Sequence, residues 1–488
     1  MSFPFPWIAC TILCPLAGAF WVRRASDPDR ARQRSLICCG LTLLFSLLTG
    51  ALFNQSQIAE AHDPWDVLSA GHHGPLFVID AVNAPLLPLS ALLFLLTVLA
   101  TLRTKVRRFS FTRMLISESL LLATLSAHNP WMLVSLLVLG TVPPWAELKA
   151  RRKPKNVYVL HMLLFICLLV TGQLLVDFSK GSIPSPAGVA LLMIAVLVRN
   201  GCIPLHCWIT DLFDHATFGT SLLYVTPMVG AYAAMRLVLP IASDWALHAI
   251  AILSLITAVY AAGMALVQSD ARRFFCYVFL SHSSLVLVGL ETATALGLTG
   301  GLCVWMSVGL SLTGFGLTLR SVEARTGRLS LNEYHGLYEH TPRLGALFLI
   351  TGLASIGFPG TLGFVGSELL IEGAMQIHPL IVAAVVIGAA LNGLAVLHAY
   401  FRVFTGTRHP ATIDLRSRPA ERIAVLVLAV LIIGGGLYPQ AGVTSRYLAA
   451  TRLMEQRSKR IGLPQKEMIH SSFLEPSERE MQIVIKSR

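Results

Sequence analysis

Ionisable side chains lie inside long apolar blocks of this sequence, where they are the residues able to do chemistry. Carboxyl and imidazole groups bind and release protons near neutral pH when their surroundings permit it. An ionised group at the centre of a hydrocarbon layer costs roughly 3 kcal/mol, so its presence there indicates a path for ions. The candidates are Glu118, His161, Arg199, His206, Asp211, Asp214, His215, His282, Glu368, Glu372 and His398.

Arg199 and Glu368 are the strongest candidates because each stands beside a sequence that breaks a helix. Arg199 opens a segment that ends at Pro204, and Glu368 follows the segment from Gly357 to Gly360. Proline removes a helix hydrogen bond and glycine loosens the backbone, so each helix is expected to break mid-membrane. A fixed cation favours the ionised form of a nearby carboxylate. We therefore expect Arg199 to set the electrostatics of an ion path and Glu368 to carry its protons.

Four further residues complete this predicted path: the relays His206 and His282, together with Glu118 and Asp211. Simpler explanations exist for several candidates. In the simplest, Arg199 caps broken backbone and Glu368 faces water. Packing within the bundle would account for the two histidines His161 and His398. Solvation at the membrane surface would account for Asp211, Asp214 and His215.

No catalytic, metal or cofactor site is expected. The sequence has no P-loop after a strand, no dinucleotide fingerprint and no zinc-protease motif. Its nine cysteines are scattered without metal-ligand spacing, which favours a packing role.

The elements that must position these groups follow from composition. Of the 488 residues, 55% are hydrophobic and 13% are charged, whereas a soluble domain carries about a quarter charged residues. The apolar residues form blocks of about 20, the length of a transmembrane helix. The net charge of +12 comes from basic clusters between these blocks, which indicates membrane topology and no nucleic-acid partner. The predicted fold is all-α and polytopic, in the inner (plasma) membrane, with lipid as the surrounding partner.

The apolar blocks predict about 14 membrane helices. We expect one transmembrane domain over residues 1–441 and a polar C-terminal tail over 442–488. The first block lacks a charged leader and a cleavage signal, so it is predicted to be a membrane helix. The spans are 5–21, 35–53, 83–102, 111–128, 131–147, 157–175, 187–209, 217–239, 245–267, 274–291, 297–320, 344–371, 380–404 and 422–441.

Basic residues alternate with the predicted helices. Clusters follow the first, third and fifth helices and recur after the ninth, eleventh and thirteenth, whereas residues 54–80 contain no Lys or Arg. The positive-inside rule therefore places both termini outside the cytoplasm. The two broken helices lie five helices apart, which favours an inverted repeat over ordinary kinks.

Four stretches resemble a known family. The segment from Pro204 to Asp211 resembles the P-L-H-x-W-L-P-D signature of the antiporter-like subunits of proton-pumping NADH:quinone oxidoreductase. Three later stretches agree in order: from Asp270 to Tyr277 followed by Ser281, from Gly336 through the second break to Phe364, and from Ala399 to Gly406. The same superfamily includes Mrp-type antiporters, hydrogenase membrane subunits and the membrane half of Dab-type carbon pumps. The resemblance implies an inverted-repeat membrane fold that moves protons or sodium with protein partners.

This chain departs from the family in its charges. The relatives place lysines mid-membrane, but this chain has no lysine between Lys180 and Lys459. Arg199 occupies the first lysine position, and Arg cannot relay a proton as Lys can. The expected acid on the fifth helix is absent because Glu147 comes too late, and Glu368 stands one residue beyond the usual charge.

Three functions remain open from the sequence. The first is the ion-conducting subunit of an inorganic-carbon (bicarbonate or CO2) transporter, with a zinc-bearing, carbonic-anhydrase-like partner; the lost lysines favour it. The second is an antiporter-like subunit of complex I, with flavin and iron–sulfur partner subunits. The third is a membrane scaffold that has lost conduction. In each, the chain itself is expected to be no enzyme.

Overall fold

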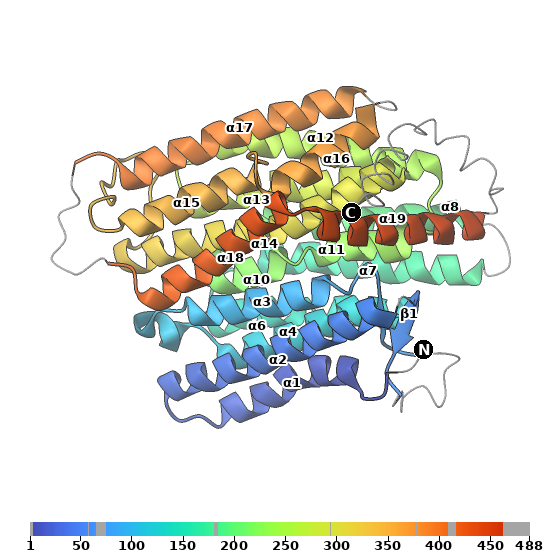
Figure 1. Ribbon diagram of the computed structural model, residues 1–488, viewed down its shortest axis with the longest axis horizontal. Coiled ribbons are helices and arrows are strands. Elements are labelled where there is room, and N and C mark those ends of the chain that lie inside the picture. Colours follow the sequence, from blue (N-terminus) through green and yellow to red (C-terminus); the bar gives the residue numbers. More distant parts are fainter. Residues whose placement is uncertain are drawn as a thin grey trace.

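The computed structural model describes residues 3–56, 58–64, 75–179, 184–292, 294–375, 379–407 and 416–461. Within them the chain is a bundle of long helices with one antiparallel pair of strands, β1 (Glu60–His62) and β2 (Val78–Asp80) (Figure 1). The predicted all-α, polytopic fold is confirmed. The helices are α1 (Trp7–Arg23), α2 (Pro28–Ser56), α3 (Leu86–Leu99), η2 (Arg103–Arg108), α4 (Phe111–Ser126), α5 (Pro130–Leu139), α6 (Val142–Ala150), α7 (Asn156–Phe178), α8 (Pro186–Asn200), α9 (Cys207–His215), α10 (Phe218–Val225), α11 (Val229–Ala233), η3 (Ala234–Val238), α12 (Asp244–Leu266), α13 (Ala271–Glu291), α14 (Ala295–Thr326), α15 (Pro342–Ser355), α16 (Leu362–Met375), α17 (Pro379–Phe404), α18 (Pro419–Leu437) and α19 (Gln440–Ile461).

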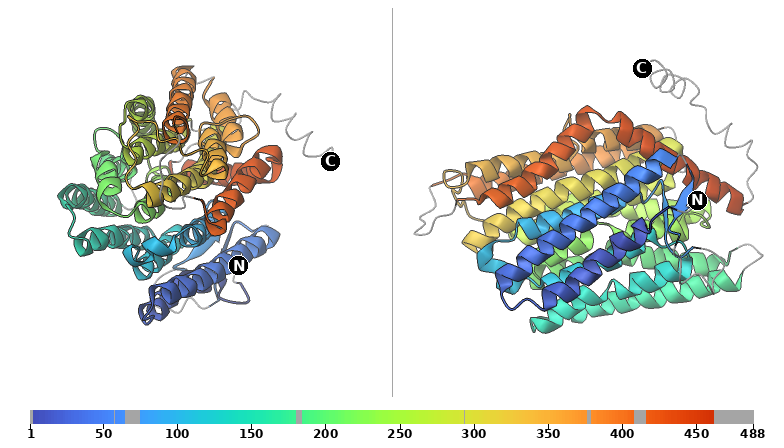
Figure 2. Two further views of the ribbon diagram at one scale, coloured as in Figure 1. Left: turned by 90° about the vertical axis from the view of Figure 1, so that its left-hand side faces the viewer. Right: turned by 60° about the horizontal axis from the view of Figure 1, so that its bottom comes forward.

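Helices dominate because a backbone in hydrocarbon must satisfy its own polar groups. In the described residues, nine helical segments are long and apolar enough to cross a membrane. The flanking helices expose large apolar side chains, such as Leu160 at 67% and Leu380 at 80%, which lipid or a partner must cover. α1 and α2 lie side by side at one flank and pack against α4 (Figures 1 and 2).

The first predicted break is present between α8 and α9. Gly201 ends α8 with φ of +71°, a conformation that costs glycine little because it has no Cβ. Side chains of α9 and α12 then pair with backbone groups on either side of this break. The Trp208 indole donates to the Val198 carbonyl over 2.8 Å, and the Ile203 N–H donates to Thr257 Oγ1 over 3.1 Å. These contacts satisfy groups that a continuous helix would have paired internally.

The second predicted break separates α15 from α16. Gly357 and Gly360 both have positive φ, +81° and +85°. α16 then packs tightly on α14, where a Cβ added to Gly300 would stand 2.4 Å from the Leu370 nitrogen. Small residues at such a contact let two membrane helices approach closely.

Two predicted helices are interrupted where no break was expected. The span 131–147 is two helices, α5 and α6, which meet at Gly140 and Thr141. The span 217–239 is α10, α11 and the π-helical segment η3, interrupted at Met228, whose φ is +53°. The Pro227 carbonyl freed there accepts a hydrogen bond from the Trp305 indole over 3.2 Å.

The C-terminal helix α19 occupies the first part of the segment expected to be a polar tail. Three of its arginines bind backbone carbonyls of distant segments. Arg446 donates to Ala81 O over 2.6 Å and to Val82 O, Arg452 donates to Ala59 O, and Arg457 donates to Leu239 O. α19 is therefore docked on the bundle. The boundary at residue 441 stays a prediction, and residues 462–488 lie outside the described residues.

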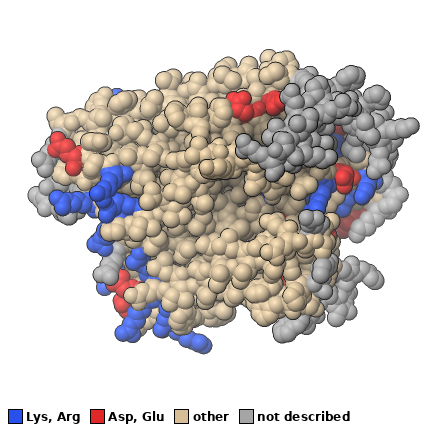
Figure 3. All heavy atoms as spheres, viewed as in Figure 1, with Lys and Arg blue, Asp and Glu red and all other residues tan. Residues whose placement is uncertain are grey.

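Basic side chains gather at one end of the bundle. Figure 3 shows most of the visible Lys and Arg at the end where α1 finishes and α2 begins. The first described residues and the end of α19 lie at the opposite end (Figure 1). The charge asymmetry predicted from the connecting segments therefore corresponds to two ends of the fold.

We expect the basic end to face the cytoplasm and both termini to lie outside. A cysteine replacing Lys153, which is exposed, should be protected from a membrane-impermeant maleimide in intact cells. A cysteine replacing Glu60 should be labelled, with the parent chain as the control for its native cysteines. Labelling at position 153 without labelling at position 60 would reverse the orientation.

Candidate functional site: a row of buried polar groups

Arg199 is buried in the centre of the bundle at the end of α8. Its guanidinium carbon lies 4.2 Å from the ring centroid of Tyr224 and 5.4 Å from that of Trp208. No carboxylate of the described residues lies within ion-pair distance of it. Aromatic faces attract a desolvated cation by about 2 kcal/mol, so the two rings partly replace the missing counter-ion.

Small cavities adjoin Arg199 on two sides. A cavity of about 30 Å³ is lined by Arg199, Tyr224 and Ser117, and a neighbouring one of about 20 Å³ shares Tyr224 and Ser117 and reaches Glu147. On the other side, a cavity of about 10 Å³ is lined by Arg199, Asn200 and Ser283. About 10–15 Å³ holds one water, so these cavities are sized for single waters between polar groups.

Glu147 ends this row toward the basic end of the bundle. It is buried on α6, and its carboxylate accepts hydrogen bonds from the Thr217 N–H over 2.7 Å and from the Thr220 hydroxyl. Arg151 lies 3.8 Å away. The sequence placed Glu147 too late on its helix to supply the acid expected mid-membrane. The structure puts this buried carboxylate beside Arg151, near the basic end of the bundle.

Other buried polar groups lie on α13, outside the three cavities beside Arg199. Ser281 bonds to the Ala258 carbonyl and accepts from the Asn392 amide over 2.7 Å. His282, the next residue, is buried, and its Nε2 has no hydrogen-bond partner in the described structure. Asn392 Oδ1 is unpaired in the same sense. Polar groups left open in a buried site are where water or a moving proton is accommodated.

This arrangement can pass protons between titratable groups through waters held by hydroxyl and amide side chains. Glu147 supplies a carboxylate to this row, whereas Arg199 stays charged and can only bias its neighbours. Tyr158 helps to hold Tyr224 in place beside Arg199. The Tyr158 hydroxyl donates to the Thr141 carbonyl and lies 3.1 Å from the Tyr224 hydroxyl.

The structure does not bring Arg199 and Glu368 together. Glu368 is exposed on α16, which packs against α14, α17 and α18, whereas α8 packs against α7, α11 and α12. Glu372, one turn further along α16, is exposed as well. The two carboxylates therefore face out of the flank of the bundle, and the electrostatic pairing expected from the sequence is not formed.

The other predicted path residues, Glu118, His206 and Asp211, line none of the three cavities. Glu118 is fully buried on α4 but turns toward α2, where the Cys39 thiol donates to its Oε2 over 3.3 Å; its Oε1 is unpaired. His206 is half-buried at the first break, with the rings of Tyr260 and Tyr277 each 6.0 Å away. Asp211 pairs with His215 on α9 over 3.1 Å.

Sequence reasoning missed Glu147, Tyr224, Asn200, Ser283 and Asn392. A usable signal existed for Glu147, because Gly140 with Pro143 and Pro144 marks a helix break before it. The neutral residues gave no signal, since hydroxyl and amide groups are common in membrane helices.

Residues 164–392 match the family model described as NADH:quinone oxidoreductase/Mrp antiporter, TM. The NAD(P)H-quinone oxidoreductase chain 4 1 of Synechococcus sp. (strain JA-3-3Ab) is 29% identical to this chain, over 90% of this chain and 91% of that protein. The chain is similar to the antiporter-like superfamily by this family model and along most of its length by this relative. The NAD(P)H-quinone oxidoreductase chain 4 of Prochlorococcus marinus (strain AS9601) is 23% identical to this chain, over 93% of each of the two proteins.

Solved structures share this fold. A chain of the Mrp complex from Dietzia sp. DQ12-45-1b superposes with a TM-score of 0.82 at 17% identity, covering 93% of this chain and 98% of that one. A chain of respiratory complex I from Thermus thermophilus superposes with a TM-score of 0.79 at 21% identity, covering 92% and 99%. The resemblance inferred from the segment after Arg199 is thus confirmed at the level of the superfamily.

Proposed function

We propose that this chain is a proton-translocating, antiporter-like subunit of a multisubunit membrane complex, of the kind named by its quinone oxidoreductase relatives. The observation that carries the proposal is the row of buried polar groups and water-sized cavities from Glu147 past Arg199 to Ser283. Buried ionisable groups in a membrane bundle are typical of ion and proton pathways. We expect the chain to supply transport while any redox or hydrolytic chemistry belongs to a partner.

The inorganic-carbon transporter is the second candidate, and the missing lysines favour it. A subunit that carries Arg199 where its relatives carry lysine cannot use that position to release a proton. A partner with different chemistry would then complete the coupling. The names of the relatives favour the first candidate.

We expect the affinity-tagged full chain, extracted in mild detergent, to retain partner subunits that mass spectrometry identifies. Flavin- and iron–sulfur-bearing partners would support the quinone oxidoreductase assignment, and a zinc-bearing, carbonic-anhydrase-like partner would support the carbon transporter. Recovery of the chain alone from freshly extracted membranes would contradict both assignments and favour the third, a membrane scaffold that has lost conduction.

The isolated chain provides the control. Without partners it should neither oxidise NADH nor hydrate CO2, because its ionisable groups serve transport only. Turnover of either kind by the chain alone would refute the assignment as a transport subunit.

A further inference from the structure

A separate cavity of about 130 Å³ opens at the basic end of the bundle. Its wall combines residues from η2, α6, α10, α13, α14 and α18, so it is surrounded by helix ends. The residues that line it are unusually rich in cations: Lys105, Arg108, Arg151, Arg272 and Arg320, against the two carboxylates Glu323 and Glu421.

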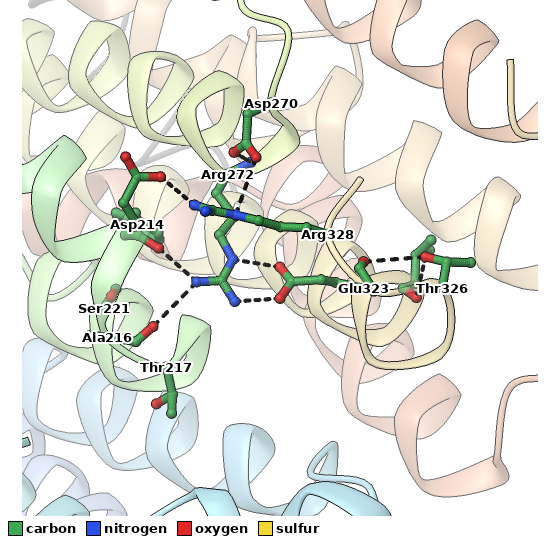
Figure 4. Close-up of polar contacts among 12 residues, drawn as sticks. Asp214, Ala216, Thr217, Ser221, Asp270, Arg272, Glu323, Thr326 and Arg328 are labelled. Atoms are coloured by element: carbon green, nitrogen blue, oxygen red, sulfur yellow. Dashed lines mark hydrogen bonds and ion pairs between the residues drawn. The ribbon is translucent and has the colours of Figure 1, made fainter. Parts of the chain in front are cut away.

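Both carboxylates of this wall are already neutralised. Arg272 holds Glu323 through two parallel hydrogen bonds and also donates to the Phe213 and Ala216 carbonyls (Figure 4). Arg325 holds Glu421 in the same two-pronged manner. Bidentate arginine–carboxylate pairs are strong and geometrically fixed, so neither acid is free to balance another cation.

Of the other cations of the wall, Arg151 lies 3.8 Å from Glu147. Lys105 and Arg108, both on η2, have no hydrogen-bond or ion-pair partner among the described residues. Arg320 donates to the Thr97 carbonyl over 3.1 Å and to Thr101 Oγ1 over 3.0 Å, and its guanidinium lies 5.2 Å from the ring centroid of Phe109. These three partners are uncharged, and the carboxylates that act on Arg320 at longer range, Glu421, Glu323 and Glu147, each already pair with another arginine.

A concave site with excess positive charge attracts anions, and guanidinium and ammonium groups together suit oxygen-rich anions. We propose that this cavity binds a small oxyanion of the phosphate or carbonate class. The phosphate of a lipid headgroup presents the same chemistry. The site adjoins the buried row but is lined by neither Glu147 nor Arg199.

The cavity also touches the end of the row. Thr217 lines it, and the N–H of Thr217 is a donor to Glu147. A bound anion would therefore sit one residue from the carboxylate at the entrance to the row.

Binding is tested on the purified full chain by its unfolding temperature. A ligand that binds only the folded chain raises this temperature with concentration. Potassium phosphate and potassium bicarbonate are compared with potassium chloride at equal ionic strength, for the wild type and for Lys105→Gln, Arg108→Gln and their combination. Arg107→Gln is the matched control, because Arg107 is exposed on the same short helix but does not line the cavity.

We expect phosphate or bicarbonate to stabilise the wild type and Arg107→Gln alike, and the concentration for half-maximal effect to rise at least tenfold in the combined variant. In a second arm, native mass spectrometry compares retention of phosphatidylglycerol and phosphatidylcholine. Retention of phosphatidylglycerol that is lost in the combined variant, with no effect of the free ions, would identify a headgroup as the oxyanion. Absence of both effects, or equal loss in Arg107→Gln, would overturn the proposal.

Discussion

Arg199→Ala is expected to lower partner-dependent proton transport at least tenfold, while Arg199→Lys retains a measurable part of it. Alanine leaves the aromatic faces of Tyr224 and Trp208 without their cation and removes the positive charge between the cavities that reach Glu147 and Ser283. The field that biases protons on neighbouring groups is lost with that charge, and a rise of about 1.4 kcal/mol in the barrier lowers a rate tenfold. Lysine restores a charge at the position where the relatives carry one. The measurement is proton flux by the assembled complex in proteoliposomes.

The matched control for this experiment is Arg34→Ala. Arg34 also stands over an aromatic ring, with its guanidinium carbon 5.2 Å from the ring centroid of Trp21, but it is only half-buried and lines none of the three cavities. Its loss should leave flux within twofold of the wild type. Wild-type flux in Arg199→Ala, with normal assembly, would show that the row does not conduct.

The two helix breaks were predictable because their cause is local. Gly201 and Gly357 take positive φ, and a glycine beside a proline inside an apolar block is enough to indicate such a conformation. The all-α architecture followed in the same way from the length of the apolar blocks. Both inferences use only residues that are neighbours in sequence.

The features that sequence reasoning missed depend on contacts between distant segments. α19 is polar, and its arginines make sense only beside the carbonyls of Ala81 and Leu239, which are hundreds of residues away. Glu147 is buried because α6 turns it toward Thr217 at the start of α10. The direction in which Glu368 points is set by the glycine contacts of α16 with α14, and no spacing within α16 reveals it.

That direction gives the Glu368 carboxylate a different expected role from the one first inferred. Glu368 lies six residues after the start of α16, about 9 Å along the helix from the break. It is exposed beside α17, whose outward side chains include Leu394 at 59% and Val386 at 54%. A bare carboxylate in such an apolar flank costs roughly 3 kcal/mol in lipid. We therefore expect a partner subunit to cover Glu368 and its neighbour Glu372 with a cation or a hydrogen-bond donor.

Glu368→Gln is expected to lower the amount of co-purified partner, and partner-dependent transport with it, while membrane insertion stays intact. Glutamine keeps the size of the side chain but carries no charge, so a charged contact with the partner at this flank is lost. Glu333→Gln is the matched control, because Glu333 is an exposed carboxylate in the connection before α15, away from the flank. Flux by the assembled complex and the amount of co-purified partner are measured for both variants. Wild-type flux and wild-type partner recovery in Glu368→Gln would show that no charged contact with a partner depends on Glu368.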